Sequence, residues 1–137
     1  MWARSCALAA VLVLSVGCSV KANYADAIRA STVFHLLMDR GEYAAIYDTA
    51  ARGFQQSISR DVLMRFLSRV SRKVGKCQGA NVGFGGYVAN TSGTYVTTTA
   101  SRTCANGPLS EQFVWLMVGG KAILLQYNAN SPLLLTD

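Results

Sequence analysis

The sequence predicts a single α+β domain in which three N-terminal helices pack on a curved four-stranded antiparallel sheet, behind a cleaved signal peptide. Up to residue 74, apolar residues recur every three or four positions, as in amphipathic helices. After residue 77 apolar and polar residues alternate and β-branched residues are frequent, as in strands. Helices followed by a run of strands favour the α+β class over a βαβ arrangement.

The N-terminus predicts export. Residues 7–16 are apolar, with Arg4 before them and Ser19 and Lys21 after them. A run of about ten residues is too short to cross a ~30 Å hydrocarbon layer, which needs about 20 residues in a helix. It therefore predicts a signal peptide. The expected organisation is a signal peptide at 1–17, a short tether at 18–24 and one domain at 25–137.

The end of this run, Val16-Gly17-Cys18, resembles the lipobox of bacterial lipoproteins, although Ser15 stands where leucine is usual. The resemblance implies that Cys18 is acylated, becomes the mature N-terminus and anchors the chain on the periplasmic side of the envelope. Ser19 after the cysteine favours the outer membrane. Plain secretion after cleavage at Ala22 and an uncleaved anchor remain alternatives.

Positive charge is concentrated in one segment. The chain carries 13 basic and 7 acidic side chains. Residues 60–76 hold six of the basic residues and one acid, Asp61. Of the four cysteines, Cys6 leaves with the signal peptide and Cys18 is the expected lipid site. The other two, Cys77 and Cys104, predict a disulfide in an oxidising compartment. A zinc site is disfavoured because no histidine or third cysteine lies near them in the sequence.

Three helices and four strands are expected. The first helix covers residues 27–39 and ends at Gly41, and the second runs from Glu42 to about residue 51, broken by Gly53. The third starts at Ser59 as N-cap and ends at Gly75. The expected strands are 81–88, 94–104, 113–118 and 122–127.

The strand patterns carry further expectations. Val82, Phe84 and Val88 are expected on one face, with a bulge at the glycines 83, 85 and 86. Residues 113–118 are apolar on both faces, which predicts cover on both sides or a face left for a partner. The apolar tail 132–135 is expected to dock on the sheet edge or to contact a partner.

A family resemblance covers most of the mature chain. The run Met38-Asp39-Arg40-Gly41-Glu42-Tyr43, then Phe54, Val74-Gly75 and Gly119-Gly120, resembles small envelope proteins with a nuclear-transport-factor-2-like (cystatin-like) domain. The resemblance implies helices over one face of a curved sheet, which often encloses a pocket. Many such proteins are lipoproteins of unknown function.

Residues for catalysis are few. His35 is the sole histidine, and Asp39 four residues later is its expected partner on the helix. It is interpreted as a boundary residue of the core. The acids show no paired-carboxylate or metal-loop spacing and are expected mostly as caps and surface groups. No catalytic residue, metal or cofactor is predicted.

The basic stripe of the third helix is the main functional signal. Its members are spaced four, three and four residues apart and line one face: Arg65, Arg69, Arg72 and Lys76. A solvated face is one interpretation. The other is a binding surface for an anionic partner, because arginines favour bidentate contact with phosphate or carboxylate. The export signal argues against nucleic acid.

A second candidate site is a pocket between sheet and helices lined by His35, Tyr95, Phe113 and Trp115. At strand alternation such aromatic residues are more often core than pocket lining. The leading functional hypothesis is a non-enzymatic envelope lipoprotein that acts as a binding or accessory subunit, or as an immunity-type inhibitor. Its partner is expected to be an envelope assembly or a secreted toxin, with anionic lipid or cell wall as further candidates. The alternative is a small-ligand carrier or enzyme that uses the pocket.

Overall fold

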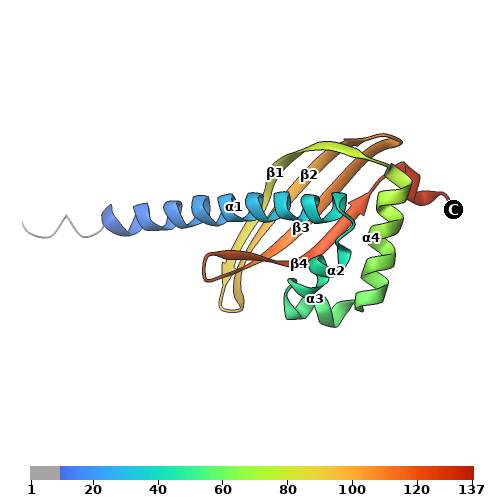
Figure 1. Ribbon diagram of the computed structural model, residues 1–137. Coiled ribbons are helices and arrows are strands. Elements are labelled where there is room, and N and C mark those ends of the chain that lie inside the picture. Colours follow the sequence, from blue (N-terminus) through green and yellow to red (C-terminus); the bar gives the residue numbers. More distant parts are fainter. Residues whose placement is uncertain (1–9) are drawn as a thin grey trace, which may run out of the picture.

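The computed structural model describes residues 10–137, with side chains from residue 18 onward. The first part of the predicted signal peptide, residues 1–9, lies outside the described residues. The elements, shown in Figure 1, are α1 (Ala10–Asp39), α2 (Tyr43–Asp48), α3 (Arg52–Ser57), α4 (Arg60–Val74), β1 (Cys77–Asn90), β2 (Gly93–Cys104), β3 (Gly107–Val118), β4 (Lys121–Asn130) and a 3-10 turn, η1 (Pro132–Leu135).

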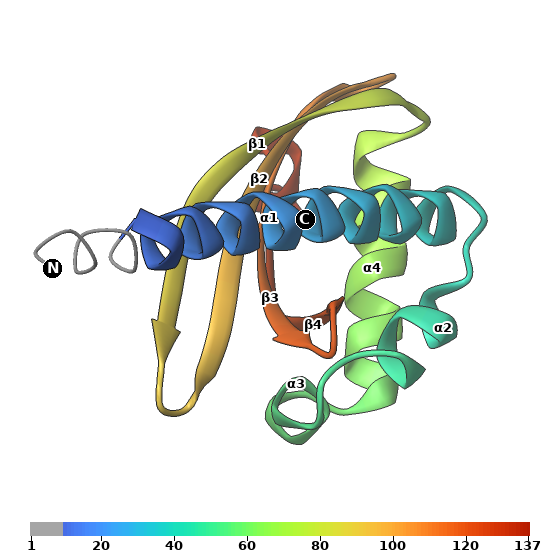
Figure 2. The ribbon, with the colours of Figure 1, turned by 90° about the vertical axis from the view of Figure 1, so that its left-hand side faces the viewer.

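The four strands form an antiparallel meander in the order β1-β2-β3-β4, which confirms the predicted sheet. Helix α1 lies across one face of this sheet, and α4 runs crosswise to it near its C-terminal end (Figures 1 and 2). The chain is therefore an α+β domain with four helices packed on an open antiparallel sheet. The prediction of three helices was wrong in number, although not in placement before the strands.

Helix α1 is continuous through the predicted cleavage junction and the predicted tether. Residues 18–24 are helical rather than extended, because no proline or glycine interrupts the backbone after Gly17. The helix contacts β1 through two neighbouring residues: Asn23 donates to the hydroxyl of Tyr87 at 3.5 Å, and the ring of Tyr24 meets Phe84 edge-on at 5.2 Å between centroids. Within residues 10–137, no helix combines the length and the apolar character needed to cross a membrane.

The predicted second helix is divided into α2 and α3. Between them Ala51 is extended, and its N–H donates to the carbonyl of Leu124 in β4 at 2.8 Å. This contact with the sheet edge interrupts the helical hydrogen bonds. Gly53 does not break a helix as predicted but lies inside α3, where an added Cβ would come within 3.2 Å of Leu125.

Helix α4 agrees with its sequence pattern. Ser59 caps it by accepting from the N–H of Val62 at 3.3 Å, and Gly75 ends it with a φ of 76°. Its buried side chains are Leu63, Leu67, Val70 and Val74.

The predicted bulge is present between Phe84 and Gly86, where the β1–β2 register shifts. At Gly85 a Cβ would lie 2.9 Å from the side chain of Thr97, so the position has no room for one. The extra residue reverses which face later side chains occupy. Val88 therefore pairs with Tyr95 on the outer face, and the expectation that it shares a face with Val82 and Phe84 was wrong.

The core lies between the inner face of the sheet and the helices. Phe34 of α1 meets Phe113 at 4.9 Å between ring centroids, and Trp115 stacks on Phe113 at 5.4 Å. The disulfide between Cys77 and Cys104 is confirmed, and it joins residues that are opposite in the β1–β2 register. It fixes the end of the sheet to which α4 connects.

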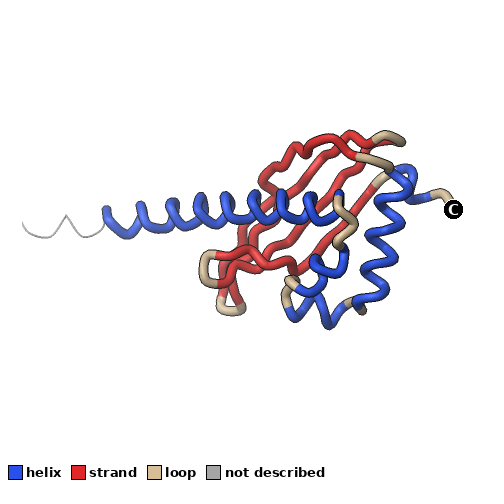
Figure 3. Tube along the Cα trace, in the orientation of Figure 1, coloured by secondary structure: helices blue, strands red, loops and turns tan. Residues whose placement is uncertain are grey.

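The outer face of the sheet divides into an apolar and a polar part. Near the β1–β2 and β3–β4 turns, four residues paired in register form what we call the outer apolar row: Val88, Tyr95, Leu116 and Ile123. Farther along the strands, which Figure 3 draws as a tube, most of the paired outer residues are polar and uncharged, for example Thr99, Gln112 and Asn128. Val88 remains about half exposed, so this face of the strands is left accessible.

Candidate functional site

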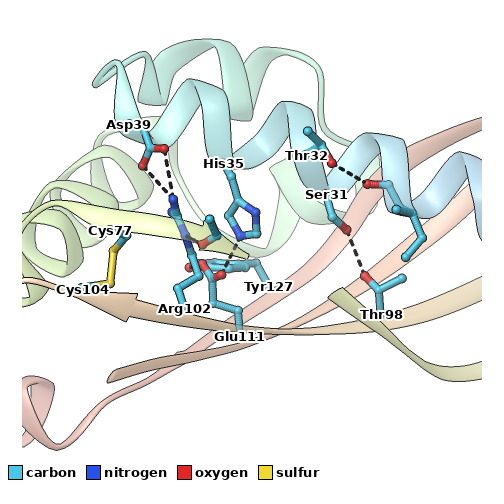
Figure 4. A network of polar contacts seen from close by, with 12 residues as sticks. Ser31, Thr32, His35, Asp39, Cys77, Thr98, Arg102, Cys104, Glu111 and Tyr127 are labelled. Atoms are coloured by element: carbon cyan, nitrogen blue, oxygen red, sulfur yellow. Dashed lines mark hydrogen bonds and ion pairs between the residues drawn. A yellow bond between two sulfur atoms is a disulfide. The ribbon is translucent and has the colours of Figure 1, made fainter. Parts of the chain in front are cut away.

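A buried polar network joins α1 to the sheet (Figure 4). His35 of α1 contacts Glu111 of β3, with 2.6 Å between Nε2 and Oε2. The hydroxyl of Tyr127 in β4 donates to the other carboxylate oxygen of Glu111 at 2.7 Å. Glu111 thus has a partner on each oxygen, as a buried carboxylate requires.

An ion pair lies beside this network. Arg102 of β2 donates from one guanidinium nitrogen to both carboxylate oxygens of Asp39, at 3.2 and 3.0 Å, and from Nε to the carbonyl of Gly79. The expected pairing of His35 with Asp39 was wrong. Both residues meet partners on the sheet instead, because β2 and β3 bring a cation to Asp39 and a carboxylate to His35.

The network has a clear electrostatic signature at Tyr127. Burial, and then the negative charge of Glu111 with the hydrogen bond to it, raise the pKa of Tyr127 well above its usual value. Among the described residues, no buried side-chain nitrogen or oxygen lacks a hydrogen-bond partner. His35, Glu111 and Tyr127 line neither of the two cavities described below. The three side chains are therefore buried between α1 and the sheet, and their contacts join the two.

A smaller polar contact supports the same interface one turn earlier on α1. The hydroxyls of Ser31 and Thr98 lie 3.1 Å apart, and the indole N–H of Trp115 donates to Thr98 at 2.9 Å. Figure 4 shows the contact between Ser31 and Thr98 on the side of α1 that faces the strands. The two contacts fix the position of Trp115 at the floor of a cavity.

The first cavity is a groove of about 610 Å³ where the C-terminal ends of α1 and α4 meet the start of β1. We call it the basic groove. Its charged lining consists of Asp39, Arg40, Arg72, Lys76 and Arg102, and its apolar lining includes Met38, Val70, Val74 and Leu109. Arg40 was not among the predicted binding residues, and it joins the groove because the turn after α1 lies beside α4.

The predicted basic stripe is divided by the structure. Arg72 and Lys76 line the basic groove. Arg69 instead donates to the carbonyl of Leu134 at 3.5 Å, and its neighbour Lys73 to that of Thr136 at 2.7 Å. These two cations hold the C-terminal tail on α4. Arg65 lies exposed on the same helix, outside the groove.

The second cavity, of about 560 Å³, lies between α1, α2 and the β3–β4 hairpin, and we call it the apolar cavity. Of the four predicted pocket residues only Trp115 lines it. Phe113 is fully buried beneath Trp115, and His35 is engaged with Glu111. Tyr95 lies on the outer face, where its hydroxyl donates to the carbonyl of Ser92. The cavity is instead bordered mainly by small and aliphatic side chains, among them Ala30, Val33, Leu37, Ile46 and Leu124.

Sequence reasoning missed the roles of Glu111 and Arg102. Glu111 was expected at the surface, but it is 4% exposed, and Arg102 is 6% exposed. The signal lies in the two-residue repeat of a strand, in which side chains two positions apart face the same side. Glu111 is two residues before the core residue Phe113, and Arg102 is two residues before Cys104, so both face the core. Within residues 10–137, no group of three or more His, Cys, Asp or Glu is placed to hold a metal ion.

These features define a small α+β domain whose helices pack on one face of an antiparallel meander. A solved structure from Catenulispora acidiphila is similar, with a TM-score of 0.52 over 82% of this chain and 93% of that one, at 16% sequence identity. Identity this low shows a shared fold alone. No family model and no curated protein matches the chain.

Proposed function

We propose that the protein is a non-enzymatic envelope lipoprotein of the nuclear-transport-factor-2-like class, anchored through acylated Cys18 on the periplasmic side, at the outer membrane. In this proposal it acts as a binding or accessory subunit, or as an immunity-type inhibitor of a secreted toxin. Support comes from the lipobox-like Val16-Gly17-Cys18 and from Cys18 itself, which is exposed and not in the disulfide.

The observation that carries the binding role is the placement of positive charge relative to Cys18. The basic groove lies at the C-terminal end of α1, which ends at Asp39, 21 residues after Cys18. At 1.5 Å per residue this separates them by roughly 30 Å along the helix. An anchor at Cys18 would hold the groove away from its own membrane. This favours a protein or cell-wall partner over the headgroups of that membrane.

The anchor is tested by Cys18→Ser. We expect the native protein to fractionate with membranes and to carry an acyl group detectable by mass spectrometry of its N-terminal peptide. The Cys18→Ser protein should be soluble. A native protein that is soluble and begins at residue 23 would contradict the anchor and support plain secretion.

The binding surface is tested by crosslinking in cells and mass spectrometry of the captured partner. The triple variant Arg65→Glu, Arg72→Glu, Lys76→Glu should lose the partner, and it spares Arg69 because that residue holds the tail. A matched control reverses two cations on other surfaces, Arg52→Glu and Lys121→Glu. Equal capture by the triple variant and the control would contradict a basic docking surface.

A second candidate function is a small-ligand carrier, favoured by the apolar cavity of about 560 Å³. This size falls in the range of ligand pockets. Native mass spectrometry should then detect a co-purified apolar molecule. Val33→Asp, at a half-exposed residue lining the cavity, should abolish it, whereas Leu36→Asp, equally exposed on α1 but outside the cavity, should not.

A further inference from the structure

We propose that the basic groove is a binding site for an organic dianion, a phosphate monoester or a pair of carboxylates carried on a small apolar body. This inference deepens the proposed function, on which its biological meaning rests, by naming the chemistry that a partner would present.

The charge of the groove is not balanced within its lining. Asp39 is the sole acid among the residues that line it, and both of its oxygens accept from Arg102. That pair is internally neutral. Arg40, Arg72 and Lys76 remain, and none of the three is within ion-pair distance of a described carboxylate.

Helix dipoles offset only part of this charge. Helices α1 and α4 both end at the groove, and a helix C-terminus carries the equivalent of about −0.5 charge. Two such ends offset about one of the three cations, which leaves about two positive charges. If the cations served only to stabilise the helix ends, fewer of them would suffice. A ligand with two negative charges matches the remainder.

The three cations are held by different elements. Arg40 lies in the turn after α1, Arg72 in the last turn of α4 and Lys76 between α4 and β1. The disulfide at Cys77 fixes the position of the segment that bears Lys76. Arg72 uses one nitrogen to donate to Ser68 at 3.0 Å, and its other guanidinium donors remain for a ligand. An arginine fork binds phosphate or carboxylate bidentately, and a lysine adds a point charge.

The volume and walls indicate that the anion belongs to a larger molecule. The groove of about 610 Å³ is the size of a site for a drug-sized ligand rather than for a bare ion. Met38, Val70, Val74 and Leu109 contribute apolar lining beside the cations. The combination fits a charged group attached to a compact apolar or aromatic body.

The test uses the exported chain carrying Cys18→Ser and needs no biological partner. Isothermal titration calorimetry would compare phenyl phosphate and phthalate, both dianions at pH 8, with neutral benzyl alcohol. We expect at least one dianion to bind with one-to-one stoichiometry, benzyl alcohol not to bind, and affinity to fall as salt rises. Binding of one dianion alone would identify the preferred charged group.

Two variants locate the binding. Arg72→Glu with Lys76→Glu changes exposed side chains and should weaken dianion binding by more than about tenfold. Arg52→Glu, exposed on α3 and outside the groove, should change it by less than about twofold. Circular dichroism would confirm that both variants are folded.

Three results would overturn the inference: no binding of either dianion at millimolar concentration, equal binding of benzyl alcohol, or unchanged binding by the double variant. These results are separate from a failure of the proposed function. A chain that binds no dianion but still captures its partner through the basic surface would retain the proposed function and lose only this site.

Discussion

At the scale of single residues, Glu111 joins helix α1 to the sheet. It accepts from Tyr127, contacts His35 and lies on the inner face of the sheet at 4% exposure. A carboxylate buried at such a position is costly unless its oxygens have partners, and helix α1 and strand β4 supply them. The same contacts fix the position of α1 on the sheet.

Glu111→Ala should destabilise the domain by about 3–5 kcal/mol, because Tyr127 and His35 would be left buried without their partner. Urea unfolding followed by circular dichroism measures the loss. Ser110→Ala, at the exposed neighbouring position, is the control and should stay within about 0.5 kcal/mol of the native protein. A loss of less than 1 kcal/mol for Glu111→Ala would contradict the importance of the network.

Tyr127 makes stability sensitive to alkaline pH. Its pKa is raised in the folded state, so above pH 10 the folded chain keeps a proton that the unfolded chain releases. The stabilisation is therefore fully present below about pH 10, the ordinary pKa of tyrosine, and is lost as pH rises beyond it. Ultraviolet titration should show one of the six tyrosines ionising only when the protein unfolds.

Tyr127→Phe is the matching variant. It should remove the late-ionising tyrosine and reduce the decline of unfolding free energy above pH 10. At neutral pH it should cost about 1–3 kcal/mol, because one oxygen of Glu111 loses its donor. An ordinary titration of all six tyrosines in the native protein would show that the hydroxyl is not enclosed as described.

At the scale of elements, the disulfide and the C-terminal tail both hold α4 against the sheet. Cys77 lies three residues after the end of α4, and the 27-residue separation to Cys104 includes the whole β1–β2 hairpin. Arg69 and Lys73 of the same helix donate to carbonyl groups of the tail. The helix that carries Arg72 of the basic groove is therefore held both by the disulfide at its end and by the tail.

Removing the disulfide with Cys77→Ala and Cys104→Ala should lower the free energy of unfolding by about 3–4 kcal/mol in the chain-entropy model. Urea unfolding in a Cys18→Ser background measures this without thiol exchange. Adding a reductant to the Cys18→Ser protein should give a similar loss, whereas the double variant should not respond to reductant. Two free thiols in the native protein would contradict the bond.

At the scale of the whole molecule, α1 sets how the domain would stand on a membrane. Tyr24, six residues after Cys18, already packs on Phe84 of β1. At 1.5 Å per residue, the contact lies about 9 Å from Cys18 along the helix. Under the proposed anchoring, the β1–β2 and β3–β4 turns and the outer apolar row would lie near the bilayer. The basic groove would lie far from it.

This orientation predicts a difference between two tryptophan probes on the outer face, each in a Trp115→Phe background. Val88→Trp, in the outer apolar row, should shift to shorter emission wavelength and be quenched by brominated lipids when the acylated protein is bound to vesicles. Gln112→Trp, in a polar row, should not. Equal quenching of both probes on vesicle-bound protein would contradict the orientation.

Much of the fold follows from local pattern. Helix α4, with its serine cap, its terminating glycine and its apolar repeat, was predicted within a residue or two. The four-strand meander and the Cys77–Cys104 bond were also predicted. Periodicity, caps and turn residues act over a few positions, so they can be interpreted without knowing what the segment packs against.

Tertiary structure alone decided the rest. The division of α2 from α3 depends on a hydrogen bond from Ala51 to the distant β4, and the outward position of Val88 depends on one inserted residue at the bulge. The partners of His35 and Asp39 come from strands more than 60 residues away. Local sequence pattern establishes which segments form helices and strands and where positive charge is concentrated. Packing determined which charges are enclosed with partners and which remain free in a groove, because that depends on contacts between segments far apart in the chain.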